Sequence, residues 1–391
     1  MKKIAEFIKT IYIRNKYNNR KRDKNVWLFG EWFGEKCCDN SFYFANYVAK
    51  NHPDIKVCWI AKDGADISRL VNNIQVLQMD SNEAHELMYI AGVAFMNQGY
   101  VDLDSKNNNY LSGALVINLW HGVPWKFLGK KKCDRTLFEK IYLFVNKFLR
   151  NTDYYLATSD FFNDICESAF DTTPSHLLYA GYPRNSGFYD AAYINDSRSK
   201  IINEYADDKD ATIITYMPTF RDKNSDVFSF AEMNNKSFED WLSVNNIIII
   251  EKMHYVSEHR KKCTSIQTSR VKQYRGVDGQ ELLAATDILI TDYSSCFFDF
   301  LILDRPIIHF LYDYEYYKNS DRGLFMPKEE AACGDIAQSE EQLIELIISN
   351  FNDKTKNKLL REKQVKKYMQ YSYNGSCEDL YSQVSHLLTK K

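Results

Sequence analysis

The sequence lacks any long uninterrupted apolar run. Its richest stretch, residues 297–310, contains Asp299, Asp304 and Arg305, whereas a membrane-spanning helix needs about 18 to 20 apolar residues in succession. The amino terminus begins basic, as a signal peptide does, but charged residues from Glu6 onward break the apolar core that such a peptide requires. We therefore expect a protein that neither crosses a membrane nor is secreted.

An excess of one charge is also missing. Lys and Arg number 50 against 52 for Asp and Glu, giving a net charge of −2, so the composition offers no general attraction to nucleic acid. The nine cysteines show no C-x-x-C spacing, which argues against a zinc site and for a reduced, cytoplasmic protein. Any binding of anionic ligands must come from local groups of residues.

The pattern of the chain predicts an α/β fold with two Rossmann-like, doubly wound domains. A length of 391 residues with 45% hydrophobic residues is more than one core usually uses. Short, continuously apolar segments alternate with helical stretches, which is typical of parallel strands covered on both faces. A polar stretch at 190–210 suggests domains at 26–200 and 201–391. The expected strands are 26–29, 57–60, 93–96, 115–117, 213–216, 247–250, 288–291 and 307–310, and the expected helices include 42–50, 161–169, 281–285 and 339–349. Asp39-Asn40-Ser41 would cap the helix at 42–50, and Ser159-Asp160 the helix at 161–169.

Residues 1–25 form a separate basic segment. They carry nine Lys or Arg against two acidic residues, and Ile4, Phe7, Ile8 and Ile11 recur at helical spacing. A basic amphipathic helix of this kind can lie on an anionic membrane surface, each cation contributing on the order of 1 kcal/mol. A solvated tail is the alternative.

The strongest local motif is Thr-Asp-Tyr-Ser-Ser at 291–295, between an expected strand and an expected helix. Ligands of open α/β sheets bind at the carboxyl ends of strands, where Ser294, Ser295 and free helix amides would suit a phosphate or diphosphate. Asp299 lies one helical turn further and could accept hydrogen bonds from a ribose. The alternative is a serine that merely caps a packed helix.

A second motif places His121 directly after the strand that ends near residue 117. Gly122 and Pro124 predict a tight turn that holds the imidazole at the edge of the sheet. With a reference pKa near 6.5, a histidine there is a plausible general base for an alcohol. A purely structural histidine is the alternative.

Further cationic segments follow strands or turns expected at the same edges. Lys252 and His254 are two apart and so share a strand face, where they could neutralise a diphosphate. Arg184 and Arg221 each stand beside a proline-fixed turn and could bind phosphate through two hydrogen bonds. Solvated residues and ordinary surface ion pairs are the alternatives.

Taken in order, these motifs resemble the CDP-glycerol glycerophosphotransferase family of teichoic acid and capsule synthesis. The matching segments are N-L-W-H-G-V-P-W-K (118–126), G-Y-P-R-N (181–185), M-P-T-F-R-D (217–222), K-M-H (252–254) and T-D-Y-S-S-x-x-F-D (291–299), with D-N-S (39–41), R-P-I-I (305–308) and R-G (322–323) in addition. They extend over roughly residues 26 to 330.

The resemblance implies a GT-B fold, an amino-terminal domain that binds the acceptor and a carboxyl-terminal domain that holds CDP. It makes His121 the base and His254 a second essential histidine. Ser294 and Ser295 become diphosphate contacts and Asp299 the ribose-binding acid. The full set of expected substrate-binding residues is Gly122, Arg184, Pro218, Thr219, Arg221, Lys252, Asp292, Tyr293, Ser294, Ser295, Asp299 and Arg322.

The expected reaction is attack of an acceptor hydroxyl, deprotonated by His121 in a cleft between the domains, on CDP-glycerol or a similar CDP-polyol, with release of CMP. We expect no cofactor and no metal. The acceptor would be a lipid-linked saccharide or polymer, and the enzyme a peripheral protein of the cytoplasmic membrane face. Two alternatives stay open: an inverting GT-B glycosyltransferase that uses a nucleotide sugar, and an inactive nucleotide-binding scaffold. Neither the choice between glycerol and ribitol nor the product length follows from the sequence.

Overall fold

The computed structural model describes most of the chain, and its contacts divide the chain into two compact units. The described residues are 2–18, 21–106, 109–128, 136–138, 140–141, 144–145, 152–219, 221, 227–253, 268–321 and 323–390. His254 and Arg322 lie outside them. Unit 1 comprises Met1–His121, Lys130–Ser186 and Tyr371–Lys391, and unit 2 comprises Gly122–Gly129 and Gly187–Gln370. The division expected near residue 200 falls inside a helix, α6 (Ala191–Tyr205).

Unit 1 is built on a seven-stranded sheet in the order β3-β2-β1-β4-β5-β6-β7, and all neighbouring strands run parallel. The expected strands are present, whereas β3, β6 and β7 were missed because they are short and their residues are partly exposed. The strands are β1 (Asp23–Phe29), β2 (Lys56–Ala61), β3 (Gln75–Gln78), β4 (Ala91–Met96), β5 (Leu115–Asn118), β6 (Tyr154–Ala157) and β7 (Leu177–Tyr179). The helices include α1 (Lys2–Tyr17), α2 (Asn40–Asn51), α3 (Asn82–Ile90), α5 (Phe161–Phe170) and α15 (Ser376–Lys390).

Strand β1 shows how this sheet is buried on both faces. Val26 and Leu28 share a core cluster with Leu87 of α3, while the alternate residue Trp27 lies 6.3 Å, ring to ring, from Phe44 of α2. Side chains of a strand alternate between faces, so a continuously apolar strand needs a helix on each side. Unit 1 is therefore covered on both faces, as the apolar runs predict.

The two helix caps predicted in unit 1 have different outcomes. Asp39 caps α2, and its carboxylate accepts a hydrogen bond from the backbone N–H of Asn40. The cap of α5 predicted at Ser159-Asp160 is wrong, because neither side chain makes a capping hydrogen bond. The carboxylate of Asp160 instead accepts a hydrogen bond from the hydroxyl of Tyr371, where the chain returns to unit 1. The returning helix α15 stacks Tyr381 on His52, with ring centroids 3.4 Å apart.

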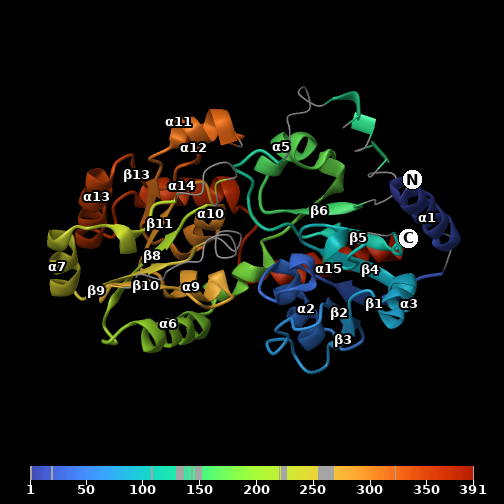
Figure 1. The fold of residues 1–391 in the computed structure, drawn as a ribbon. Helices are drawn as coiled ribbons and strands as arrows, with labels where there is room; N and C mark the ends of the chain where they lie inside the picture. Colours follow the sequence, from blue (N-terminus) through green and yellow to red (C-terminus); the bar gives the residue numbers. More distant parts are fainter. Residues whose placement is uncertain are drawn as a thin grey trace. The chain divides into compact units, whose positions relative to one another are not determined.

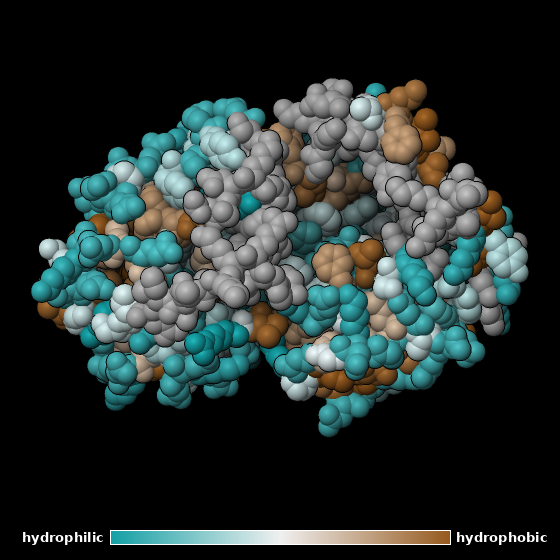
Figure 2. Space-filling view, viewed as in Figure 1, coloured by the Kyte–Doolittle hydropathy of each residue, from teal (hydrophilic) through white to brown (hydrophobic). Residues whose placement is uncertain are grey.

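The basic amino-terminal segment forms a helix, α1, as predicted. Its buried side is set by Ile13, which joins the core cluster of unit 1, whereas Ile8 and Tyr12 are exposed. Further exposed apolar side chains, Leu137 and Phe138 among them, lie in the region of residues 136–145. Figure 2 shows apolar side chains at the surface in this part of the molecule. Among the described helices, none combines the length and apolar character needed to cross a lipid bilayer.

Unit 2 is built on a six-stranded parallel sheet in the order β10-β9-β8-β11-β12-β13. This is the strand order of a dinucleotide-binding Rossmann domain, with the reversal between β8 and β11. The strands are β8 (Thr212–Met217), β9 (Ile247–Glu251), β10 (Val271–Gln273), β11 (Ile288–Thr291), β12 (Ile307–Phe310) and β13 (Asp335–Ala337). The helices are α6 (Ala191–Tyr205), α7 (Lys236–Val244), α9 (Gly279–Ala285), α10 (Cys296–Phe300), α11 (Tyr314–Tyr316), α12 (Lys328–Ala331), α13 (Glu340–Asn352) and α14 (Lys358–Tyr368).

The sheet of unit 2 is also buried on both faces. Ile213 of β8 packs with Leu282 of α9, and the next residue, Ile214, packs with Leu343 of α13. Figure 1 shows α6 and α9 on one side of this sheet and α13 on the other. The doubly wound prediction for the second half of the chain is confirmed.

A short segment next to His121 belongs to unit 2, which the sequence did not indicate. Trp125 is buried there, and its indole N–H donates a hydrogen bond to the carbonyl of Met326 at 2.9 Å. Lys126 forms an isolated antiparallel bridge with Leu324. The chain therefore leaves unit 1 directly after His121 and returns to it after eight residues, Gly122–Gly129.

Candidate functional site

In unit 2, two candidate motifs follow the strands at which the strand order reverses. Pro218 and Thr219 follow β8, and Asp292 to Ser295 follow β11, its neighbour in the sheet. The backbone N–H of Thr219 donates to the carboxylate of Asp292 at 2.8 Å, so the two turns are directly joined. Ligands of open α/β sheets bind in the crevice outside such a reversal.

Arg221 is at the centre of a buried ion-pair cluster. Its guanidinium donates to Asp292 at 2.9 Å and, through two nitrogens, to Asp313 at 2.7 and 3.1 Å. Burial lowers the pKa of Arg221, but the charges of Asp292 and Asp313 more than offset this, so the pKa is raised above its ordinary value. The side chain is 1% exposed. Arg221, expected to bind substrate, thus has all three guanidinium nitrogens engaged within unit 2.

Tyr293 belongs to the same cluster. Its hydroxyl donates to Asp313 at 2.9 Å, and its ring stacks on that of Tyr317 at 3.7 Å. Burial first, and then the charge of Asp313, raises the pKa of Tyr293. The tyrosine is thus a neutral structural member of the cluster, beneath the serines that follow it.

Ser294 and Ser295 remain half-buried at the start of α10. The hydroxyl of Ser294 accepts a hydrogen bond from the backbone N–H of Cys296 at 3.4 Å. Asp299 is buried on the same short helix. The turn that carries the two serines is the part of the motif that the structure leaves accessible to an anion.

Lys252 lies at the carboxyl end of β9, as predicted, next to β8. It is half-buried, its ammonium group is 3.4 Å from the carbonyl of Gly276 and it lies 4.8 Å from the ring centre of Tyr274. The preceding Glu251 is buried, and burial raises the pKa of its carboxyl. Its oxygens accept hydrogen bonds from Ser229 and Phe230, so Lys252 extends from a strand end that is itself fixed.

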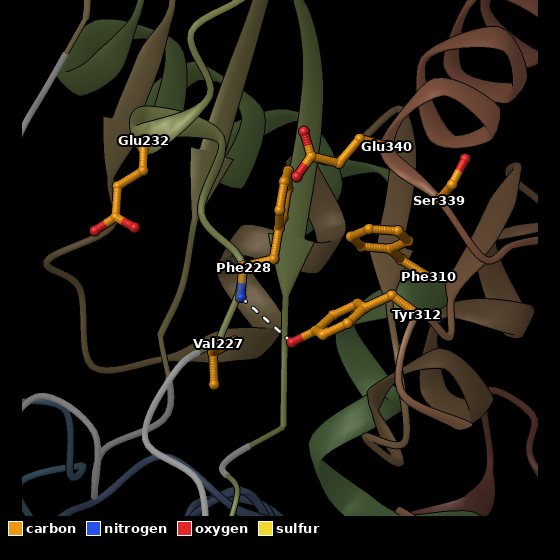
Figure 3. A pocket seen from close by; sticks show the side chains of 7 residues that line it. All are labelled: Val227, Phe228, Glu232, Phe310, Tyr312, Ser339 and Glu340. Atoms are coloured by element: carbon orange, nitrogen blue, oxygen red, sulfur yellow. Dashed lines mark hydrogen bonds between the residues drawn. The ribbon is translucent and has the colours of Figure 1, made fainter. Parts of the chain in front are cut away.

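A pocket of about 460 Å³ lies beside the carboxyl end of β12 (Figure 3). Phe228, Phe310 and Tyr312 form its aromatic wall, and the hydroxyl of Tyr312 accepts a hydrogen bond from the backbone N–H of Phe228 at 3.3 Å. Two carboxyl side chains, Glu232 and Glu340, also line it. Carboxylates repel a diphosphate, so the serine turn suits the phosphates better than this pocket does.

In unit 1, His121 lies in a turn after β5 whose backbone is unusual. Trp120, directly before it, has a φ of 56°, and Gly122, directly after it, has a φ of 141°. Glycine tolerates such angles, whereas for a bulky residue the left-handed conformation costs on the order of 1–3 kcal/mol. The rings of Trp120 and His121 lie 4.3 Å apart. His121 is half-buried at this edge, in agreement with the tight turn that the sequence predicts.

Side chains from two other turns hold the backbone before His121. Asn40 donates through its amide to the carbonyls of Leu119 at 3.3 Å and Trp120 at 2.9 Å. Arg184 donates through Nη1 to the carbonyl of His121 at 3.0 Å and to Asp39 at 2.8 Å. Arg184, expected to bind substrate, thus has this nitrogen engaged within unit 1.

Sequence reasoning missed two of these partners. Asp313 follows β12 in a tyrosine-rich segment, and nothing in its local pattern distinguishes it from a surface acid. Asn40 stood in the D-N-S match at 39–41, where the sequence suggested only a helix cap. Contacts between distant segments, rather than local motifs, reveal both roles.

Comparison with known proteins gives one family and one fold. The model of the family described as CDP-Glycerol:Poly(glycerophosphate) glycerophosphotransferase matches residues 11–386. Structures of the wall teichoic acid polymerase TagF superpose with a TM-score of 0.79 at 20% identity, covering 100% of this chain and 98% of the other. The GT-B fold class expected from the sequence is confirmed.

Relatives in curated collections are longer or of similar length. A teichoic acid poly(glycerol phosphate) polymerase of Bacillus spizizenii is 32% identical over 269 residues, which cover 66% of this chain and 65% of the relative. A teichoic acid glycerol-phosphate transferase of Staphylococcus aureus is 26% identical over 358 residues, 89% of each chain. The match to the teichoic acid poly(glycerol phosphate) polymerase of Staphylococcus epidermidis covers 48% of that relative. The chain therefore spans about half to two thirds of the length of these polymerases.

Proposed function

Because the chain belongs to the CDP-glycerol:poly(glycerophosphate) glycerophosphotransferase family, we propose that it transfers glycerol phosphate from CDP-glycerol to a hydroxyl group of a lipid-linked saccharide or polymer, releasing CMP. The observation that carries the proposal is a pair of half-buried motifs at sheet edges, one in each unit. Half-buried His121 stands at the carboxyl edge of the unit 1 sheet, and the Ser294-Ser295 turn stands at the strand reversal of unit 2.

In the proposed reaction, His121 accepts the proton of the acceptor hydroxyl as its oxygen attacks the phosphorus that carries glycerol. A new P–O bond forms, and the bond from this phosphorus to the bridging oxygen breaks. CMP leaves with the electron pair on its phosphate. Backbone amides and hydroxyls of the serine turn, together with Lys252, would stabilise the diphosphate and the departing charge. His254 and Arg322 remain candidates outside the described residues.

The test is CMP release from CDP-glycerol with a saccharide acceptor, measured for the wild type, His121→Ala and His386→Ala. General-base catalysis is worth about 10²- to 10⁴-fold in rate, so His121→Ala should lose activity by that factor. His386 is an exposed histidine of α15 in the same unit and serves as the matched control. Equal activity of His121→Ala and the control would remove His121 as the base.

The donor is tested by substrate exchange in the same assay. CMP release from CDP-ribitol but not CDP-glycerol would keep the reaction class and change the polyol. UDP release from a UDP-sugar would support the glycosyltransferase alternative, since one fold can serve both chemistries. Binding of CDP without any turnover would support the scaffold.

We also propose that the reaction needs no metal ion, because the half-buried Lys252 and the serine turn supply positive character at the donor edge. A chelator should leave turnover unchanged. One group of described residues, Asp80, His85 and Asp104 of unit 1, could offer three ligand atoms within 4.8 Å of one another. His85→Ala is therefore a useful control: chelator sensitivity that persists in this variant would place the required metal at the reaction itself.

Membrane association is proposed for unit 1. Ile8 and Tyr12 are exposed on α1 near Lys9, and Leu137 and Phe138 are 75% and 78% exposed. Deleting residues 1–25 would also remove Ile13 from the core and the first residues of β1, so point variants are the better test. Replacement of Ile8 and Tyr12 by serine should weaken binding to anionic vesicles. Unchanged binding would exclude α1 as the anchor.

A further inference from the structure

We propose that Asn40 and Arg184 are positioning residues that fix His121 for proton transfer, and that Arg184 serves this purpose instead of binding a phosphate. The inference rests on the proposed function, in which His121 is the base. The residues come from the first turn of α2 and from the turn after β7, so three separate segments of unit 1 meet at the backbone that precedes the imidazole.

Three successive carbonyl groups of the His121 turn are held by these two side chains. The amide of Asn40 bonds the carbonyls of Leu119 and Trp120, and Nη1 of Arg184 bonds the carbonyl of His121. The two side chains are also linked, since the backbone N–H of Arg184 donates to the side-chain oxygen of Asn40 at 3.2 Å. The amide therefore uses both its donor and its acceptor, which defines its orientation.

The turn needs this support because its backbone is strained. Trp120 has a φ of 56°, a conformation that a bulky side chain adopts at a cost and retains only where surrounding contacts impose it. Its backbone N–H donates to the side chain of Asn118 at 2.8 Å, so both polar backbone groups of Trp120 are bonded to asparagine side chains. Without Asn40, the turn would relax toward an ordinary conformation and carry the imidazole with it.

Arg184 is in turn held in place by Asp39. The carboxylate of Asp39 accepts hydrogen bonds from Arg184 at 2.8 Å and from the indole N–H of Trp32 at 3.2 Å. Beneath it, Glu31 accepts hydrogen bonds from the backbone N–H groups of Asp39 and Phe42. Burial first, and then the charge of Asp39, raises the pKa of Glu31. The cation thus sits on a buried, preorganised support.

This arrangement predicts how the two roles of Arg184 differ in kinetics. A phosphate ligand contributes to donor binding, so its loss raises KM for CDP-glycerol. A positioning residue acts through the base, so its loss lowers kcat and leaves KM within about threefold of the wild-type value. Arg184→Met should show the second pattern.

The decisive variant is Asn40→Asp, which keeps the size of the side chain but replaces the donating amide with an oxygen that repels two carbonyls. A displacement of about 1 Å costs on the order of 100-fold in rate, so kcat should fall by that factor. Asn46→Asp is the matched control: it lies on the same helix, and its amide bonds the carbonyl of Arg69. It should keep wild-type kcat.

Combination with His121→Ala separates this inference from the proposed function. In that background Asn40→Asp should have no further effect, because the group it positions is gone. An active wild type, an impaired His121→Ala and a normal Asn40→Asp would overturn the positioning role alone. A wild type and a His121→Ala variant of equal activity would overturn the base as well.

Hydrogen exchange followed by mass spectrometry tests the positioning without any substrate. Peptides that contain residues 118–123 should exchange about tenfold faster in Asn40→Asp than in the wild type or Asn46→Asp, because local opening governs exchange. Equal exchange in all three proteins would overturn the inference even if no donor were turned over.

Discussion

Each unit buries an arginine at its candidate site, and the two arginines bind different kinds of partner. Arg221 in unit 2 pairs with two carboxylates, Asp292 and Asp313. Arg184 in unit 1 pairs with Asp39 and also donates a hydrogen bond to the carbonyl of His121. Both stand near prolines and both read as phosphate ligands in the sequence. In the structure, one stabilises a cluster and the other fixes a backbone.

The difference shows what a buried arginine can contribute at an active edge. A guanidinium offers five N–H donors in a rigid plane, more than one carboxylate can use. In unit 2 the remaining donors of Arg221 bind a second acid, Asp313, and the guanidinium lies over the rings of Tyr293 and Tyr317. In unit 1 it reaches the turn that carries the imidazole. Both guanidinium groups are engaged within their own units, so we expect the chemistry to depend on the half-buried serines, Lys252 and His121.

The largest expected effect is the loss of stability when the buried arginine of unit 2 is replaced. Arg221→Met leaves Asp292, which is fully buried, and Asp313 without their cation, and loss of one partner of a buried ion pair costs about 3–5 kcal/mol. Arg184→Met should cost less, about 2–3 kcal/mol by the same reasoning, because its loss leaves the carboxylate of Asp39 without this cation, whereas the loss of Arg221 affects two carboxylates. Urea unfolding of both variants measures the two losses.

The ranking is the informative result of that experiment. A larger loss for Arg184→Met would mean that the unit 1 support is the stronger of the two. In that case, the kinetic effect of Arg184 would have to be separated from partial unfolding. Asp292→Asn removes one charge from the unit 2 cluster but keeps the shape of the side chain. Its loss of stability should be smaller than that of Arg221→Met, because Asp313 stays paired with Arg221.

The next effect concerns pH and a buried histidine of unit 2, His309. Burial lowers the pKa of His309 to about 4, whereas a histidine in the unfolded chain takes up its proton near pH 6.5. Between these values the unfolded chain binds more protons than the folded one, so stability falls as the pH drops. The expected loss is about 2 kcal/mol between pH 7 and pH 5.

His309→Gln tests this assignment. The variant lacks the titrating group, so its free energy of unfolding should fall by about 2 kcal/mol less than that of the wild type over the same pH interval. The comparison of slopes, rather than of absolute stabilities, removes the effect of losing the hydrogen bond from the backbone N–H of Cys333. Equal slopes would show that other groups govern the acid response of unit 2.

The family and much of the fold could be predicted from the sequence for a physical reason. Strands such as Ile247–Glu251 are buried on both faces and leave a continuous apolar run, and the predicted family membership is confirmed. The return of α15 to unit 1 and the placement of Trp125 in unit 2 could not be predicted. These depend on packing between residues far apart in the chain, for which local periodicity carries no signal.

For the candidate site, the sequence predicted where the residues lie in the fold better than it predicted which residues they contact. Motifs at strand ends located His121, Lys252 and the serine turn correctly at sheet edges, because parallel strands share a carboxyl edge. The partners of Arg184 and Arg221 could not be read, since an arginine beside a proline looks the same whether it faces a ligand or a buried carboxylate. Only the three-dimensional pairing with Asp39 and Asp292 distinguishes these cases.

The smallest expected effect is the loss of stability when Trp125 is replaced, in the segment that follows His121 directly in the sequence. Trp125 lies four residues after His121 and is buried in unit 2, with ring centroids 5.7 Å from Tyr293 and 5.6 Å from Phe297. Trp125→Phe removes the hydrogen bond to the buried carbonyl of Met326. The expected cost in stability is about 1–2 kcal/mol.

Trp27→Phe is the matched control, because Trp27 is equally buried and its indole N–H also bonds a backbone carbonyl, that of Lys24 in unit 1. Both variants should lose similar stability in urea unfolding. Turnover should fall only for Trp125→Phe, because residues 122–129 continue directly from the turn that carries the base. If both variants retained the same turnover, the indole anchor of Trp125 would serve the stability of unit 2 alone, and the support of His121 would lie entirely in Asn40 and Arg184.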